Sequence, residues 1–192
     1  MVASQRPDLA PSGYARLDFE KVYEENLKFV WRAARRLGVN PADTDDVVQE
    51  AFFVAHRRLA EFEGRASIKT WLFRILMFVI RHHRRSHQRR PDQRAAESNT
   101  DLEQLADGRA RGPAEAAERA DAVRILDRLL EHLDSEKREV FVLAEIEQLS
   151  SVEIAEVLDL NVNTVYSRLR VARQEFQRAL TRFQEREMGG RP

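Results

Sequence analysis

The stretch SSVEIAEVLDLNVNTVYSRLRVAR, residues 150–173, carries the clearest structural signals in the C-terminal part of the chain. Ser150 and Glu153 form the S/T-x-x-E pattern of a capping box, which predicts that a short helix begins here. Residues 159–161 then suit a tight turn, and Asn161 can cap a second, longer helix. A short helix, a turn and a longer basic helix together predict a helix-turn-helix.

The second helix of this motif carries side chains of the types that suit base edges and phosphates. In a helix-turn-helix, the N-terminal part of the second helix enters the major groove of DNA. The residues expected on this surface are Asn163, Thr164, Tyr166, Ser167, Arg168 and Arg170. The alternative is an ordinary pair of packed helices with a solvated arginine face.

Apolar residues recur at helical spacing through most of the chain. One stripe runs over 19–37, with Asp18 as a candidate N-cap and Gly38 as the terminating residue. Further helices are expected after Pro41, after Ser67, from Ala122 and after Ser135. No segment alternates with the period of a strand, so the sequence predicts an all-α protein.

Composition excludes several classes of protein. The chain has 192 residues and no cysteine, which excludes disulfides, thiolate zinc sites and a cysteine nucleophile. Its glycines are dispersed, so no glycine-rich phosphate loop is expected. The longest apolar run, residues 75–80, is too short to span a bilayer, and the N-terminus has no apolar signal segment. We expect a cytoplasmic protein without membrane insertion, cofactor or metal.

Charge is balanced overall but polarised locally. Lys+Arg and Asp+Glu are 32 each, yet residues 64–90 contain eight Lys/Arg and no acid. Residues 121–160 contain 11 acids against 4 bases, and residues 161–186 contain 6 arginines against 2 glutamates. The basic run 81–90 extends a helix that carries Trp71 and Phe73, and such a surface can bind phosphates and stack unpaired bases. The alternative is a basic end that only solubilises the helix and complements its dipole.

Two clusters of titratable residues are not expected to be sites. Asp43, Asp45, Asp46 and Glu50 fit the acid-rich start of a helix, and no histidine lies at a ligand spacing among them. The histidines at 82, 83 and 87 lie among arginines that would repel a cation.

The order of these parts, and the strings DTDDVVQEAFFVAHRRLAEFEG (43–64), KTWLFRI (69–75) and the stretch 150–173, resemble an extracytoplasmic-function (ECF) sigma factor of the sigma-70 family. The resemblance covers about 19–90 and 121–182. It implies two small helical domains, a region 2 bundle and a region 4 helix-turn-helix, joined by a flexible linker. It also implies a non-enzymatic factor that directs RNA polymerase core to promoters by recognising −10 and −35 elements.

The resemblance divides the chain into five parts: a disordered tail (1–17), region 2 (18–90), an acidic flexible linker (91–120), region 4 (121–183) and a C-terminal tail (184–192). The implied partners are RNA polymerase core, through its β′ clamp helices and β flap, promoter DNA and a possible anti-sigma factor.

The resemblance also assigns residues to three surfaces. The residues implied to bind core polymerase are Asp46, Gln49, Glu50 and Phe53. Those implied to bind −10 DNA are Phe62, Gly64, Arg65, Ser67, Lys69, Trp71, Arg74, Phe78, Arg81, Arg84 and Arg85. Those implied to bind −35 DNA are Arg138, Asn163, Thr164, Tyr166, Ser167, Arg168, Arg170 and Arg173.

Phe78 stands where the family has an asparagine that helps capture an unstacked base. Trp71, Ile75 and Phe78 fall at i, i+4 and i+7, so the preferred interpretation places Phe78 in the core. The alternative places it on the DNA-facing side, where it would stack on a base. Two rival functions also remain: a stand-alone helix-turn-helix regulator, and a sigma-like interaction decoy.

Overall fold

The computed structural model of the protein describes residues 17–88 and 112–189. These residues form helices and turns, with no strand among them, which confirms the all-α prediction. Almost all of the expected N-terminal tail, and the expected linker up to residue 111, lie outside the described residues, as do Arg89 and Arg90. None of the helices in these two ranges combines the length and apolar character that crossing a membrane requires.

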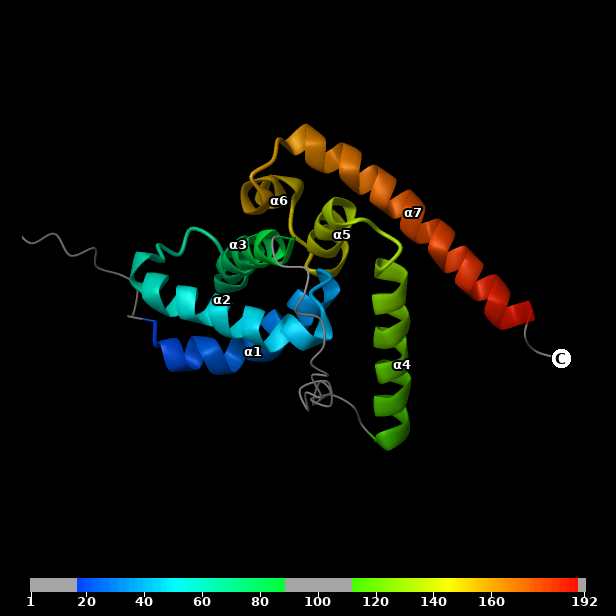
Figure 1. Ribbon diagram of the computed structural model, residues 1–192, viewed down its shortest axis with the longest axis horizontal. Coiled ribbons are helices and arrows are strands. Elements are labelled where there is room, and N and C mark those ends of the chain that lie inside the picture. The colour runs from blue at the N-terminus through cyan, green and yellow to red at the C-terminus, as the bar shows by residue number, and fades with distance from the viewer. Residues whose placement is uncertain (1–16, 89–111, 190–192) are drawn as a thin grey trace, which may run out of the picture.

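The first half is a bundle of three helices, α1 (Phe19–Arg36), α2 (Thr44–Arg58) and α3 (Ile68–Gln88), which pack against one another (Figure 1). Two short 3₁₀ turns, η1 (Pro41–Asp43) and η2 (Leu59–Glu61), flank α2.

Local capping explains where these helices begin and end. The carboxylate of Asp18 accepts a hydrogen bond from the Glu20 amide at 3.1 Å, and Ser67 Oγ accepts one from the Thr70 amide at 3.0 Å. Gly38 follows α1 with a φ of +84°, a backbone conformation that residues with a Cβ rarely adopt. The Arg138 guanidinium of the second half lies where a Cβ of Gly38 would be, so a larger residue here would also have to displace that side chain.

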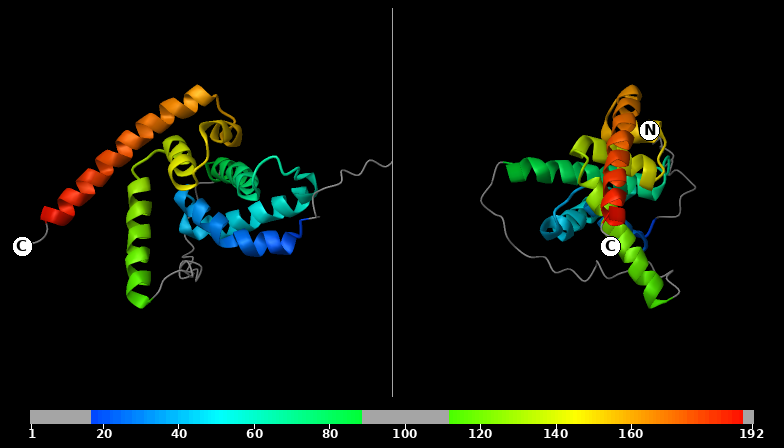
Figure 2. Two further views of the ribbon diagram at one scale, coloured as in Figure 1. Left: turned by 180° about the vertical axis from the view of Figure 1, so that it is seen from behind. Right: turned by 90° about the vertical axis from the view of Figure 1, so that its right-hand side faces the viewer.

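The second half contains α4 (Pro113–Leu130), α5 (Ser135–Phe141), a single π-helical turn η4 (Val142–Ile146), α6 (Ser151–Leu158) and α7 (Val162–Gly189). The long α7 packs on α5, α6 and α4, with residues as far along as Ala179 buried, and its last turns continue beyond the other helices (Figures 1 and 2).

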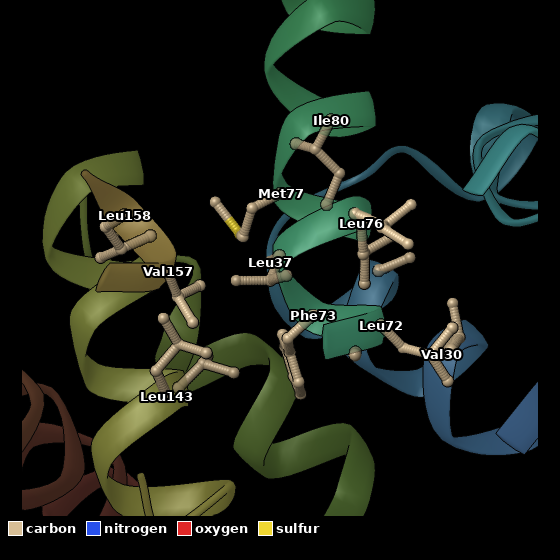
Figure 3. Packing of buried hydrophobic residues seen from close by; sticks show 14 of the residues in the cluster. Val30, Leu37, Leu72, Phe73, Leu76, Met77, Ile80, Leu143, Val157 and Leu158 are labelled. Carbon is tan, nitrogen blue, oxygen red and sulfur yellow. The ribbon is translucent and has the colours of Figure 1, made fainter. Parts of the chain in front are cut away.

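The two halves share one hydrophobic core. Leu37, Phe73 and Met77 of the first half face Leu143 and Leu158 of the second (Figure 3), and all five are buried. Helix α3 packs against α6, and α1 contacts α4. The three-helix bundle and the helix-turn-helix are therefore packed together in this structure.

One expectation about the core is wrong. Phe78 was expected to be buried, but 64 % of its surface is exposed. The buried stripe of α3 instead contains Leu72, Leu76 and Val79, which also fall at i, i+4 and i+7. Helix α3 is apolar around most of its circumference between Trp71 and Ile80, so periodicity could not choose between the two stripes.

Two helix starts differ from the expected ones. Helix α4 begins at Pro113 rather than near Ala122, so the last part of the expected linker is helical. Proline at the first position of a helix suits this start. The N-cap of α5 is Asp134 rather than Ser135, and its carboxylate accepts a hydrogen bond from the Lys137 amide at 2.9 Å.

Candidate nucleic-acid and polymerase interfaces

The helix-turn-helix forms as the sequence predicts. Ser150 and Glu153 make both hydrogen bonds of a capping box at the start of α6. Asp159 ends α6 in the left-handed conformation, with φ +54°, and the Asn161 side chain accepts a hydrogen bond from the Asn163 amide at 2.9 Å. Val165 and Leu169 of α7 are buried in the shared core, and this packing sets which side of α7 faces outward.

The first turns of α7 present a polar face to solvent. Asn163, Tyr166, Ser167 and Arg170 are all exposed and fall at i, i+3, i+4 and i+7, on the side away from Val165 and Leu169. Thr164 is half-buried at the edge of this face. The structure thus brings together most of the residues expected to contact −35 DNA.

The remaining arginines of that set lie elsewhere. Arg168 pairs with Glu136 of α5 at 2.8 Å, and Arg173 pairs with Glu145 of η4 at 2.7 Å. Arg138 donates a hydrogen bond to the Leu130 carbonyl at 2.8 Å, and burial lowers its pKa. Its guanidinium lies against Gly38 of the first half, so it does not join the polar face of α7 in this arrangement.

Helix α2 presents the face that was assigned to core polymerase. Asp46, Gln49, Glu50 and Phe53 are all exposed at i, i+3, i+4 and i+7, opposite a buried stripe that includes Val47. Phe53 is 61 % exposed, and the Arg57 guanidinium lies 5.9 Å from the centre of its ring. The face therefore combines an acidic and amide-bearing half with one large apolar side chain.

A groove of about 500 Å³ adjoins this face, between α1 and α2. Its walls are mainly aromatic, and its rim is acidic and polar. The lining includes Phe19, Tyr23, Trp31, Phe52, Phe53, Asp45, Asp46, Gln49 and His56. Asp45 accepts a hydrogen bond from Trp31 Nε1 at 3.0 Å, so this acid helps to fix the groove wall.

The residues expected to begin the −10 surface gather at the start of α3. The rings of Phe62 and Trp71 meet edge to face with centroids 5.3 Å apart. Gly64 turns the loop with φ +69°, and the exposed Arg65 pairs with Glu63 at 2.5 Å. Lys69 Nζ lies 5.2 Å from the centre of the Phe29 ring.

Farther along α3, the residues expected to bind −10 DNA do not all lie on one side of the helix. Arg74, Phe78 and Arg85 are exposed. Phe73, whose aromatic ring was expected beside the basic run, is 1 % exposed and cannot stack on a base. Arg81 and Arg84 follow Met77 at i+4 and i+7, on the side of α3 that faces the second half of the molecule.

Arg81 and Arg84 bind a buried carboxylate that sequence reasoning did not identify. Glu139 of α5 is 5 % exposed, and it accepts from Arg84 Nη1 at 2.8 Å and from Arg81 Nη2 at 3.4 Å. The same guanidinium groups donate to the carbonyl oxygens of Leu37, at 2.7 Å, and Leu158, at 3.1 Å. The only sign of this carboxylate in the sequence was the acid-rich composition of residues 121–160, which did not indicate that Glu139 binds arginines of α3.

Two more acids of the second half lie beside bases of the first. Glu147 pairs with Arg36 at 3.7 Å, and burial raises the pKa of Glu147 although Arg36 opposes the shift. Burial likewise raises the pKa of Asp127, with the charges of Arg36 and Arg35 opposing it. One carboxylate oxygen of Asp127 is buried without a hydrogen-bond partner among the described residues.

Comparison with known proteins matches both halves to one family. A family model described as Sigma-70 region 2 matches residues 22–90, and one described as Sigma-70, region 4 matches residues 124–176. The RNA polymerase sigma factor CnrH of Cupriavidus metallidurans is 37 % identical over 153 residues, which cover 78 % of this chain and 79 % of CnrH. The ECF RNA polymerase sigma-E factor of Escherichia coli K12 is 33 % identical over 140 residues, which cover 71 % of this chain and 73 % of the relative.

Solved structures agree with this assignment. CnrH in complex with the cytosolic domain of CnrY superposes with a TM-score of 0.57 at 28 % identity, covering 85 % of this chain and 87 % of CnrH. The sigma factor RpoE of Bartonella quintana, solved with the anti-sigma factor NepR, has the same fold, with a TM-score of 0.62 at 20 % identity over 85 % of this chain and 97 % of RpoE. The chain therefore belongs to the extracytoplasmic-function group of the sigma-70 family, and it is a sigma factor of transcription initiation.

Proposed function

We propose that the chain binds RNA polymerase core through α2 and brings it to promoters by contacting the −35 element with α7 and the −10 element with α3. The observation that carries this proposal is the exposed face of α7, where Asn163, Tyr166, Ser167 and Arg170 lie together. Arginine can bind guanine bidentately, and asparagine can bind adenine, when such a face enters the major groove. The role needs no catalytic group of its own.

The core-binding part of the proposal rests on the face of α2. Asp46, Gln49 and Glu50 offer acceptors and negative charge, and Phe53 offers an apolar anchor beside the groove. A partner helix with basic and apolar side chains would complement this surface. The clamp helices of the β′ subunit are the partner that we propose.

The −10 part rests on Trp71, Arg74 and Phe78, which α3 places along one side. Phe78 offers a stacking face and no hydrogen-bonding group, so we expect broad tolerance of base changes where it acts. Arg74 and Arg85 would contact phosphates and hold the strand without reading its sequence.

Gel shift and transcription with purified core polymerase test the function. A sigma factor shifts promoter DNA only when core is present, and it supports initiation on a subset of a genomic promoter library. A stand-alone regulator shifts duplex DNA without core. A decoy fails in both conditions, and either of these last two outcomes would overturn the proposal.

We also propose that an anti-sigma factor controls this chain. The support is that the RpoE neighbour was solved with an anti-sigma factor and the CnrH neighbour with the cytosolic domain of CnrY. Co-purification of the full chain from its native host, followed by a core-binding competition with any protein recovered, tests this. The proposal fails if no co-purified protein reduces core binding.

A further inference from the structure

The Glu139 carboxylate lies in a fork made by two arginines of α3. Its Oε1 accepts from Arg84 at 2.8 Å and its Oε2 accepts from Arg81 at 3.4 Å, so each oxygen has its own guanidinium. Glu139 is almost fully buried, whereas about a third of each arginine side chain is exposed. The acid comes from the second half of the chain, and the bases come from the first.

This fork suits a phosphate as well as it suits a carboxylate. Guanidinium groups bind both anions with parallel N–H donors, and the geometry of the two complexes is similar. The Leu37 carbonyl of the first half holds Arg84 through its other donor at 2.7 Å, whereas the Leu158 carbonyl that holds Arg81 at 3.1 Å belongs to the second half and leaves with Glu139. The helix that carries both arginines also carries Arg74 and Phe78 on its exposed side.

We propose that Arg81 and Arg84 form a binding site for a backbone phosphate of single-stranded DNA, and that Glu139 occupies this site while the two halves are packed together. Packing of the halves and binding of DNA by this fork then exclude each other. The inference rests on the proposed function only in taking α3 as a nucleic-acid surface; the competition itself follows from the ion pairs.

The other acids of the second half that lie beside bases of the first half repeat this pattern. Arg36 of α1 pairs with Glu147 at 3.7 Å, and Asp127 of α4 lies beside Arg35 and Arg36. In each case the base belongs to the first half and the acid to the second. A polyanion arriving at the first half therefore competes with the second half for the same cations.

A distance measurement tests whether Glu139 holds the halves together. The chain contains no cysteine, so labels attached at Glu24→Cys on α1 and Gln177→Cys on α7, both exposed positions, report only the separation of the halves. We expect a narrow distance distribution in the parent chain and a second, longer population in E139Q. The matched control is E175Q, which breaks the 2.6 Å ion pair between Lys137 and Glu175 inside the second half, and it should leave the distribution unchanged. An unchanged distribution in E139Q would overturn the proposal.

A binding measurement tests whether the vacated fork takes phosphate. The probe is fluorescein-labelled oligothymidylate of about 20 nucleotides, long enough for several phosphate contacts, with anisotropy measured at low salt. E139Q should bind it roughly 3- to 10-fold more tightly than the parent chain, because a larger fraction of molecules has the fork open. E175Q should bind as the parent chain does.

A second variant keeps both tests decisive. R81Q/R84Q removes the other side of the ion pairs, so it should show the longer distances but bind the probe no more tightly than the parent chain. Adding these changes to E139Q should abolish the gain in affinity, with far-UV circular dichroism confirming that each variant is folded. A gain that persists without the two arginines would refute the phosphate site.

These experiments separate failure of the occluded phosphate site from failure of the proposed promoter role. If E139Q opens the chain and gains Arg81- and Arg84-dependent affinity, but core polymerase gives no promoter-specific initiation, the occluded site stands and the promoter role fails. If initiation is specific but E139Q changes neither distance nor affinity, the promoter role stands and the occluded site fails.

Discussion

Helices α3 and α7 both carry several arginines, yet the structure uses these arginines differently. On α7, Arg170 lies exposed among Asn163, Tyr166 and Ser167. On α3, Arg81 and Arg84 turn toward another part of the same molecule and bind Glu139. A basic run therefore shows which helix can bind an anion, but only the opposing element shows which anion it meets.

The two helices therefore differ in their availability to DNA. The polar face of α7 is open while the halves are packed together, whereas part of the basic surface of α3 is neutralised from within. Under the proposed function, contact of α7 with the −35 element needs no rearrangement of α7 itself, whereas full use of α3 requires separation from α5.

The largest effect should come from the buried side of α3. Leu76 is 1 % exposed, so Leu76→Ala should cost about 2–5 kcal/mol of unfolding free energy through lost burial and a cavity. Phe78→Ala, two residues away but exposed, should change it by no more than about 0.5 kcal/mol. Urea denaturation followed by circular dichroism measures both. A large loss of unfolding free energy in Phe78→Ala would show that Phe78 packs in the core and would contradict its assignment to the DNA-binding surface.

Gly38→Ala should weaken the contact that joins the first half to α5. The positive φ strains any residue with a Cβ, and the new methyl group would displace the Arg138 guanidinium, at a cost of roughly 1–3 kcal/mol. Thermal unfolding measures the loss. Gly112→Ala is the matched control, because an added Cβ there meets nothing within 4 Å, and it should unfold like the parent chain.

On α7, the two neighbouring arginines should behave differently. Arg170→Ala should cost ~1–3 kcal/mol of promoter affinity and relax specificity at one position of the −35 element, because this side chain lies on the exposed polar face. Arg168 is held by Glu136, so Arg168→Ala should weaken all sequences alike. Binding of the holoenzyme to a set of single-base −35 variants measures both. Equal loss of specificity in the two variants would contradict this division.

The next prediction concerns the face of α2 assigned to core polymerase, which lies on neither α3 nor α7. Replacing Asp46 and Gln49 with Ala should weaken binding to core by about tenfold, or 1.4 kcal/mol, without loss of helicity, because both side chains are exposed and support no packing. Fluorescence titration with core measures the affinity. Unaltered affinity in the double variant would remove the assignment of this face.

The smallest effect concerns Asp127, which lies between the halves. Burial raises the pKa of the Asp127 carboxyl in the folded chain above its usual value. The contribution of this carboxyl to stability is therefore largest below about pH 4, and it declines as pH rises through the folded-state pKa. Asp127→Asn removes the penalty at neutral pH and should raise Tm by at most about 3 °C. The difference between the two proteins should shrink as pH falls toward 4. A difference that grows in acid would reverse the assigned direction.

The features that local chemistry decides could be predicted from the sequence. Asp18, the capping box at Ser150 and the cap at Asn161 each depend on partners two or three residues away, and all three form. Asp134 and Ser135 are adjacent residues that can both cap a helix, so the choice between them was not decided locally. Residues from Pro113 to Ala120 have good helical propensity but no apolar stripe, and the periodicity used to find helices missed them.

The features that distant packing decides could not be predicted. Glu139 meets Arg84, which is 55 positions away, and nothing in the sequence around either residue indicates the other. Local charge polarity was visible, but both interpretations of the basic run, a nucleic-acid surface and a solubilising helix end, left out an acid of the same chain as its partner. The exposure of Phe78 was likewise undecided until the position of the second half selected which side of α3 was covered.

The unbroken length of α7 has a mechanical consequence. The 28 residues of α7 at 1.5 Å per residue make a rod of about 42 Å, and its packing on α5, α6 and α4 leaves residues as far along as Ala179 buried. The rod therefore turns together with the helices that hold it, and a 10° rotation about its first turn sweeps its far end through about 7 Å. The last turns of α7 thus convert a small tilt of the second half into a displacement that a single label could follow in real time.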